Sequence, residues 1–334
     1  MLQARLTATA NLISIFGLFW IFLTHLGPLF TTFHPFYHPI RFIFLLTAIV
    51  CNAKNLPLVW HFRVGWHTLN HYAYQPKALG PDDLFKPIVT KGVGSPLPEC
   101  DYNLHKSNST YFSDADMART MLTTSLLRKG MKEGITFPDG PAKDVKGRYS
   151  IALGAVSCQF KREIAPHQRF DIWTRLLSWD RKWIYLCSHF VRAGTVQPTG
   201  WLQQPWKKAK KGSKKAGSEE EWKKAVFATS VAKYVVKKGR LTIPPAECLE
   251  MSGLLPSSRQ ANGNGAASGS AGKWDMEKIE ARRQAGLQYA EKFGALDGLF
   301  EEWPTMFGRS ADATSKQEDG ADSFDVIGEF GDFF

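Results

Sequence analysis

An acid and a histidine stand close together in a polar stretch of this 334-residue sequence, which reads ECDYNLHKSNSTY from Glu99 to Tyr111. Such side chains can act as a general base or nucleophile, or can orient a water molecule for attack on a carbonyl carbon. Asp101 and His105 are the two candidates for this work. Cys100 is also a nucleophile by type, but the sequence shows no base partner for it, and a small strand residue is the simpler interpretation.

The polar stretch leads directly into a predicted helix. Apolar side chains recur at helical spacing behind it, namely Tyr111, Ala115, Ala118, Leu122 and Leu126. This spacing places them on one face of an amphipathic helix. Ser107, Asn108 or Ser109 can cap its start, and the sequence 128–130 (RKG) is typical of a helix end. Because unpaired N–H groups at a helix N-terminus can stabilise a developing oxyanion, the helix start completes the predicted site.

Alternating residues before and after this helix predict a sheet. An apolar run broken by prolines precedes the polar stretch, and four longer strand-like runs follow the helix, at residues 149–161, 169–179, 182–192 and 225–236. Short connections between the later runs favour antiparallel neighbours. The order predicts an α+β fold, in which a curved antiparallel sheet wraps around one long central helix.

The motif and the element order resemble the hotdog-fold acyl-CoA thioesterases of the 4-hydroxybenzoyl-CoA type. The similarity spans roughly residues 85–245 and is greatest to the membrane-anchored eukaryotic branch that contains thioesterase superfamily member six and similar fungal proteins. The family pattern is Asp-x-Asp-x-x-x-His-x-Asn-Asn-x-x-Tyr. The matching positions are Asp101, His105, Asn108 and Tyr111, and the departures are Glu99 for the first Asp and Ser107 for the first Asn.

The resemblance implies an enzyme that hydrolyses an acyl thioester carried by coenzyme A or an acyl-carrier protein. It makes Asp101 the base or nucleophile. The roles it implies for His105 and Asn108 are to orient Asp101, a water molecule or the acyl group. The helix start would bind the substrate through Ser107, Ser109, Thr110 and Tyr111. Hotdog domains usually pair through their sheets, so the resemblance also implies a homodimer.

The two departures keep a second hypothesis open, a non-catalytic hotdog protein that binds acyl chains or scaffolds lipid or polyketide metabolism.

Composition excludes several other classes of protein. The formal charge of +11 comes largely from a lysine-rich run rather than a basic nucleic-acid face, and the five cysteines form no Cys-x-x-Cys pair. The sequence has no P-loop, no Gly-x-Gly-x-x-Gly before a helix and no Gly-x-Ser-x-Gly, and we expect no metal and no cofactor.

The N-terminal region predicts a membrane anchor over residues 1–60. No Asp, Glu, Lys or Arg occurs between Arg5 and Arg41, and residues 12–33 are long enough to span a bilayer. Residues 42–53 form a second apolar run, so the anchor is single- or double-pass. A secretory signal peptide and a buried soluble helix are the competing interpretations, and a structural membrane protein is a more distant one. We expect an intracellular membrane, such as the endoplasmic reticulum.

The rest of the chain divides by composition. Residues 61–84 form a predicted juxtamembrane segment. Within it, residues 61–71 favour an amphipathic helix with Trp60, Trp66 and Tyr72 near the headgroups over a metal site at His67 and His71. Residues 85–250 form the predicted hotdog domain, interrupted at 201–224 by a lysine-rich insertion that is either a solvated loop or a basic contact to membrane or coenzyme A phosphates. A flexible linker (251–273), a helix packing on the outside (274–304) and an acidic tail (305–334) follow.

Overall fold

The fold is seen in a computed structural model, which describes residues 42–43, 46–75, 79–133, 147, 149–196, 198, 200–202, 219–255 and 274–300. Four predicted segments lie mostly or wholly outside these ranges, namely the membrane-spanning run at 12–33, the lysine-rich insertion, the linker and the acidic tail. Within the described ranges, no helix combines the length and the apolar character that crossing a membrane requires.

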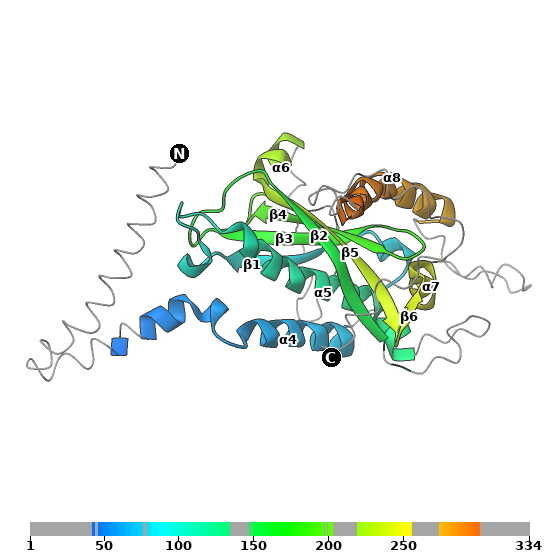
Figure 1. Ribbon diagram of the computed structural model, residues 1–334, viewed down its shortest axis with the longest axis horizontal. Helices are drawn as coiled ribbons and strands as arrows, with labels where there is room; N and C mark the ends of the chain where they lie inside the picture. The colour runs from blue at the N-terminus through cyan, green and yellow to red at the C-terminus, as the bar shows by residue number, and fades with distance from the viewer. Residues whose placement is uncertain are drawn as a thin grey trace, which may run out of the picture.

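An antiparallel sheet forms the centre of the molecule (Figure 1). Its five long strands follow the spatial order β1-β3-β4-β5-β2, and their bounds are β1 Ile88–Gly94, β2 Tyr149–Phe160, β3 Arg169–Trp179, β4 Ile184–Arg192 and β5 Val226–Lys238. The four strands expected after the helix are confirmed, with ends that shift by at most two residues. A short sixth strand, β6 Leu241–Ile243, pairs with β5 and was missed in the sequence.

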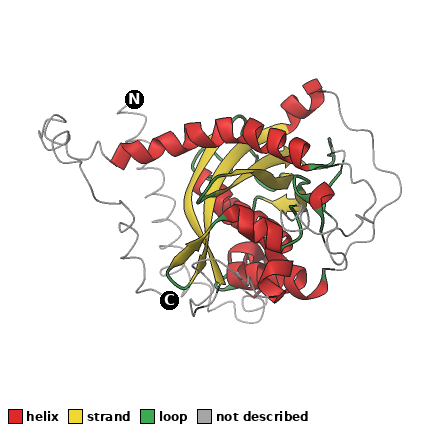
Figure 2. Cartoon of the chain, turned by 90° about the vertical axis from the view of Figure 1, so that its right-hand side faces the viewer, coloured by secondary structure: helices red, strands yellow, loops and turns green. Residues whose placement is uncertain are grey.

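The central helix, α5 Asn108–Glu133, packs against the inner face of the sheet, and Figure 2 shows the strands curling around it. Every residue of its predicted apolar stripe is buried, and these residues contact strand residues such as Ile172 and Phe190. The helix starts where the polar stretch predicts. Its predicted end at Gly130 is wrong by three residues, because the last turn continues to Glu133. The expected α+β arrangement of a curved sheet around one long helix is therefore present.

Helix α8, Met276–Gly294, covers the outer face of the sheet, as Figures 1 and 2 both show. Gly286 permits the close approach, because a Cβ at this position would collide with the carbonyl of Leu177. Ser178 Oγ donates a hydrogen bond to the Arg283 carbonyl over 2.7 Å, and Arg283 donates to the Trp179 carbonyl over 2.8 Å. The prediction that a C-terminal helix packs on the outside of the domain is confirmed.

Helix α4, Val59–Tyr74, packs on the far side of α5, so the layers are α4, α5, sheet and α8 (Figure 1). His71 Nδ1 lies 2.8 Å from Ser125 Oγ, and Arg128 donates to the Tyr72 carbonyl over 2.8 Å.

Helix α7, Pro245–Met251, was missed in the sequence, although proline is well suited to a first helical turn. The remaining short elements are η2 Ala53–Asn55, η3 Pro81–Asp83, η4 Leu97–Glu99, α6 Glu219–Ala225 and η6 Ala295–Phe300.

Candidate functional site

The motif forms a tight loop between η4 and the start of α5. An antiparallel bridge joins Cys100 to Lys106, and the Asp101 amide donates to the His105 carbonyl over 2.8 Å. Leu104 completes the turn with a φ of 58°, in the left-handed region. The Asp-x-Asn sequence favours such a turn because a short carboxylate can accept bonds from nearby amides. We refer to residues 101–105 as the Asp101 loop.

Asp101 organises this loop with its own carboxylate. Its Oδ1 accepts a hydrogen bond from the Asn103 amide over 2.9 Å and a longer one, 3.4 Å, from the His105 amide. The side chain is half-buried. Asp101 therefore has the turn role that its sequence favours, and its carboxylate also remains accessible at the surface of the domain.

His105 points to a different partner. Its Nε2 lies 3.0 Å from Glu163 Oε2, and Glu163 belongs to the turn between β2 and β3. The imidazole thus ties the Asp101 loop to the end of β2. The contacts of the two side chains show no direct pairing of the Asp101 carboxylate with the His105 ring, so the structure holds the two predicted catalytic groups in one loop but gives them separate partners.

The predicted substrate-binding residues lie at the start of α5, with Ser107 just before the helix and the others in its first turn. Ser107 Oγ is 3.1 Å from Ser109 Oγ, and the Thr110 hydroxyl donates to the Ser107 carbonyl over 2.7 Å. Asn108 and Ser109 are exposed at the helix start. Tyr111 is different, because the structure buries it in the core. Its ring meets Phe160 and Phe190 edge-on, with centroids 5.0 and 4.9 Å away, and burial raises the pKa of its hydroxyl.

Four charged side chains lie beneath the Asp101 loop, and we call them the four-charge cluster: Lys54, Glu99, Lys106 and Asp114. Lys106 Nζ is 2.6 Å from Glu99 and 3.0 Å from Asp114, and Lys54 Nζ is 2.8 Å from each of the same two carboxylates. Glu99, Lys106 and Asp114 are only 5%, 3% and 1% exposed. Positive and negative charges thus alternate in a site shielded from water.

The four-charge cluster fixes the position of the Asp101 loop on the helix. Glu99 and Lys106 flank the loop, and Asp114 lies in the second turn of α5. Backbone bonds reinforce the arrangement, since the Ser107 amide donates to the Glu99 carbonyl and the Lys106 amide to the Ile164 carbonyl, each over 2.8 Å. Removing one partner of such a buried ion pair leaves an uncompensated charge, which typically costs about 3–5 kcal/mol.

Sequence reasoning missed Lys54, Lys106 and Asp114 and treated Glu99 only as a departure from a pattern. One signal was available. Asp114 stands on the buried side of α5, beside Ala115 and Ala118, and an acid on a core-facing stripe requires a cation. Two cations serve it: Lys106 lies nearby in the sequence, but Lys54 could not be identified because it is 60 residues away in the chain.

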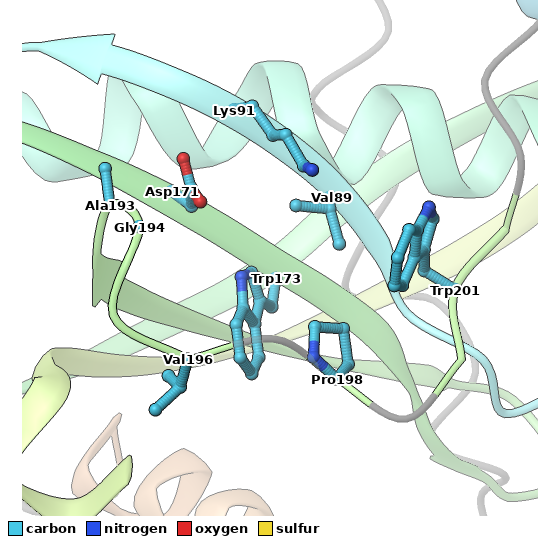
Figure 3. A pocket seen from close by; sticks show the side chains of 9 residues that line it. All are labelled: Val89, Lys91, Asp171, Trp173, Ala193, Gly194, Val196, Pro198 and Trp201. Atoms are coloured by element: carbon cyan, nitrogen blue, oxygen red, sulfur yellow. The ribbon is translucent and has the colours of Figure 1, made fainter. Parts of the chain in front are cut away.

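Two cavities lie along strand β1. One, of about 250 Å³, lies beside the four-charge cluster between α4, α5 and β1, with walls that include Lys54, Arg63, Met117 and Met121. The other, of about 220 Å³, lies at β1 and β3 and is shown in Figure 3. There Lys91 Nζ is 5.4 Å from the centroid of the Trp201 ring. None of the predicted site residues lines either cavity, and the first cavity is linked to the candidate site through Lys54 of the four-charge cluster.

Comparison with known proteins identifies the relatives of this chain. A family profile described as the thioesterase-like superfamily matches residues 96–211, which include the Asp101 loop. The probable thioesterase atnL of Emericella nidulans is 36% identical over 270 residues, covering 75% of this chain and 84% of the relative. The thioesterase poxG of Penicillium oxalicum is 35% identical over 269 residues, covering 77% and 85%. Protein THEM6 of Xenopus laevis is 26% identical over 150 residues, covering 45% and 65%.

Proposed function

The chain belongs to the thioesterase-like hotdog superfamily, and we propose that it hydrolyses an acyl thioester with Asp101 as the base or nucleophile. The observation that carries this proposal is the position of the Asp101 loop. Its half-buried carboxylate precedes the start of α5 by a few residues, and the four-charge cluster holds the loop to that helix. A carboxylate beside a helix N-terminus supplies a base and oxyanion donors in one place.

The proposed reaction proceeds through a tetrahedral oxyanion. Asp101 takes a proton from water while the water oxygen forms a bond to the thioester carbonyl carbon. Amides of the first turn of α5 stabilise the negative charge that develops on the carbonyl oxygen. When this oxyanion collapses, the carbon–sulfur bond breaks, the thiolate leaves and takes a proton, and a carboxylic acid remains. If Asp101 acts as a nucleophile instead, its carboxylate oxygen bonds to the carbonyl carbon and displaces the thiolate, which takes a proton, and water then hydrolyses the resulting anhydride to the carboxylic acid and free Asp101.

The cavity beside the four-charge cluster supports an anionic, thiol-linked carrier such as coenzyme A. Its walls combine Met117 and Met121 with the cationic side chains of Arg63 and Lys91, and with Lys54, which already pairs with Glu99 and Asp114. Cations suit the phosphates of the carrier, and methionine side chains adapt to apolar chains of different shape.

A thiol-release assay on the full chain with acyl-coenzyme A of short to long chain length tests the proposal. We expect turnover with at least one chain length, and that length identifies the substrate class. A folded protein that binds these thioesters without turning any of them over would favour the second candidate function, a hotdog protein that binds acyl chains. The pairing of His105 with Glu163 rather than Asp101 is the observation that favours it.

We infer that the protein also associates with a membrane. Helix α4 exposes Phe62, Trp66 and Leu69, which recur at helical spacing, and Phe62 is 74% exposed. An apolar stripe on a surface helix is typical of a helix lying at a bilayer interface, and the apolar run at 12–33 precedes it in the sequence. Alkaline extraction of membranes tests the anchor. We expect the chain to remain in the membrane pellet, and its release into the supernatant would contradict a spanning segment.

We infer that the chain forms a homodimer through strand β2. Among the described strands β2 pairs only with β5, so one of its edges is open. Leu153 on this strand is 43% exposed, and an open apolar edge favours pairing with a second strand. Light scattering should give the mass of a dimer, and Leu153→Lys should shift it to the mass of a monomer. A monomeric wild-type chain would overturn this inference.

A further inference from the structure

A larger cavity lies on the opposite side of the sheet, between its outer face and helix α8. Its volume is about 600 Å³, compared with about 250 Å³ for the cavity beside the four-charge cluster. A volume of this order is typical of a small-molecule site. We call it the α8 cavity. None of the residues predicted for thioester chemistry lines it, so it needs a separate explanation.

The strand register gives this cavity a polar floor. Arg175 on β3 pairs with Cys187 on β4, and Cys187 pairs with Val231 on β5, so the three side chains form one row on the outer face. In the next row His189 pairs with Thr229, and the His189 ring lies 3.0 Å from the Thr229 hydroxyl. A guanidinium and several hydrogen-bonding groups therefore lie under a helix, where a purely structural interface would be apolar.

The charges that line the α8 cavity are all positive. Arg175 comes from the floor, Arg282 and Lys292 come from α8, and none of the described residues that line the cavity is a carboxylate. Burial lowers the pKa of the Arg175 guanidinium, and the nearby positive charge of Arg282 lowers it further. Burial and Arg175 also lower the pKa of His189 to about 4, so this ring is neutral near pH 7.

Other cations on the same side of the molecule have acidic partners. The buried Lys233 pairs with Asp297, and Arg283 on α8 pairs with Glu280. Arg175 instead donates one hydrogen bond, over 3.3 Å, to the Leu176 carbonyl. A partly buried guanidinium without a carboxylate is costly unless an anion neutralises it, so the α8 cavity is suited to a negatively charged ligand.

The walls of the cavity are apolar. Leu177 lies on the floor, and Phe293 and Leu296 come from the C-terminal part of α8 and from η6. We propose that the α8 cavity binds an organic anion, a carboxylate or phosphate attached to an apolar group, with the anionic head on Arg175 and Arg282 and the apolar body against Phe293 and Leu296. Guanidinium groups bind such heads through two parallel hydrogen bonds.

Isothermal titration calorimetry on the full chain tests this site with decanoate, decyl phosphate, inorganic phosphate and 1-decanol as probes. We expect decanoate or decyl phosphate to bind at least tenfold more tightly than 1-decanol and inorganic phosphate, because only these two carry both a charge and an apolar chain. Preference for decanoate identifies a carboxylate ligand, and preference for decyl phosphate identifies a phosphate ligand. Equal binding of decanol, or no binding of either anion, would overturn the proposal.

Single-arginine variants assign the binding to this cavity. Arg282 is exposed on α8, so Arg282→Gln should fold normally, and we expect it to weaken binding of the preferred anion at least tenfold. Arg240→Gln is the matched control, because Arg240 is exposed in the turn between β5 and β6 and does not line the cavity. Anion binding that Arg282→Gln leaves unchanged would place the ligand elsewhere, for example at the Asp101 loop, and would reject the α8 cavity as its site.

Discussion

The buried amine of Lys106 lies 2.6 Å from the carboxylate of Glu99, so one ion pair closes the Asp101 loop from both ends. The loop itself contains the acid and the histidine to which we attribute thioester chemistry. Because Asp114 on α5 shares Lys106, the same contact fixes the loop to the central helix. The geometry of the proposed site thus depends on charges that do not themselves take part in the chemistry.

Lys106→Met should destabilise the protein strongly. The substitution removes the ammonium group but keeps most of the unbranched side chain, and it leaves Glu99 and Asp114 with Lys54 as their one remaining cation in the four-charge cluster. We expect a loss of about 3–5 kcal/mol in the free energy of unfolding, measured by urea denaturation. Lys161→Met is the control, since Lys161 is exposed. Equal stability of the two variants would mean that the cluster does not hold the loop.

Stability should fall as the pH decreases from about 6.5 to 4. Burial, with a contribution from His67, lowers the pKa of His71 to about 4 from an ordinary value near 6.5. In this window the unfolded chain binds a proton that the folded chain excludes, so acid favours unfolding. The full effect of His71 is on the order of 3 kcal/mol.

Urea denaturation at several pH values checks this prediction. His71→Gln should flatten the dependence between pH 6.5 and 4, and His61→Gln should not, because His61 is exposed. Half-buried His189 adds a second contribution of the same sign, because its pKa is also about 4. The same slope in wild type and His71→Gln would contradict the assignment to His71.

Gly286→Ala should weaken the packing of α8. Alanine normally stabilises a helix by up to about 1 kcal/mol relative to glycine, but here the added methyl group would collide with the Leu177 carbonyl. We expect a lower melting temperature and faster proteolysis of α8. A methyl group added at Gly294 would meet no atom of the described residues within 4 Å, so Gly294→Ala should have little effect. A stabilising Gly286→Ala would show that α8 does not dock as closely as described.

Local patterns predicted most of the fold. The apolar stripe from Tyr111 to Leu126 determined the buried face of α5, and alternation gave the four later strands to within two residues. The end of α5 was wrong at Gly130 because packing against the rest of the domain outweighs the low helix propensity of one glycine. Helix α7 was missed because the pair Pro244 and Pro245 is typical of the end of a strand, although proline also begins helices.

The site was predictable only where it is local in sequence. The Asp101 loop and the start of α5 follow from short-range turn and capping preferences. The ion pairs of the four-charge cluster do not follow from such local preferences, since the Lys54–Asp114 pair joins residues 60 positions apart. Tyr111 was expected in the substrate site and lies in the core, because its helical position places the ring between Phe160 and Phe190.

The most direct test of the central claim is the turnover number of Asp101→Asn with the preferred acyl-coenzyme A. Asparagine keeps an oxygen that can accept the bonds from the Asn103 and His105 amides, so the loop and the melting temperature should be preserved. We predict that the turnover number falls by about 10²–10⁴-fold, as expected when a general base is lost. A folded Asp101→Asn variant that turns over within threefold of wild type would contradict the assignment of thioester hydrolysis to Asp101.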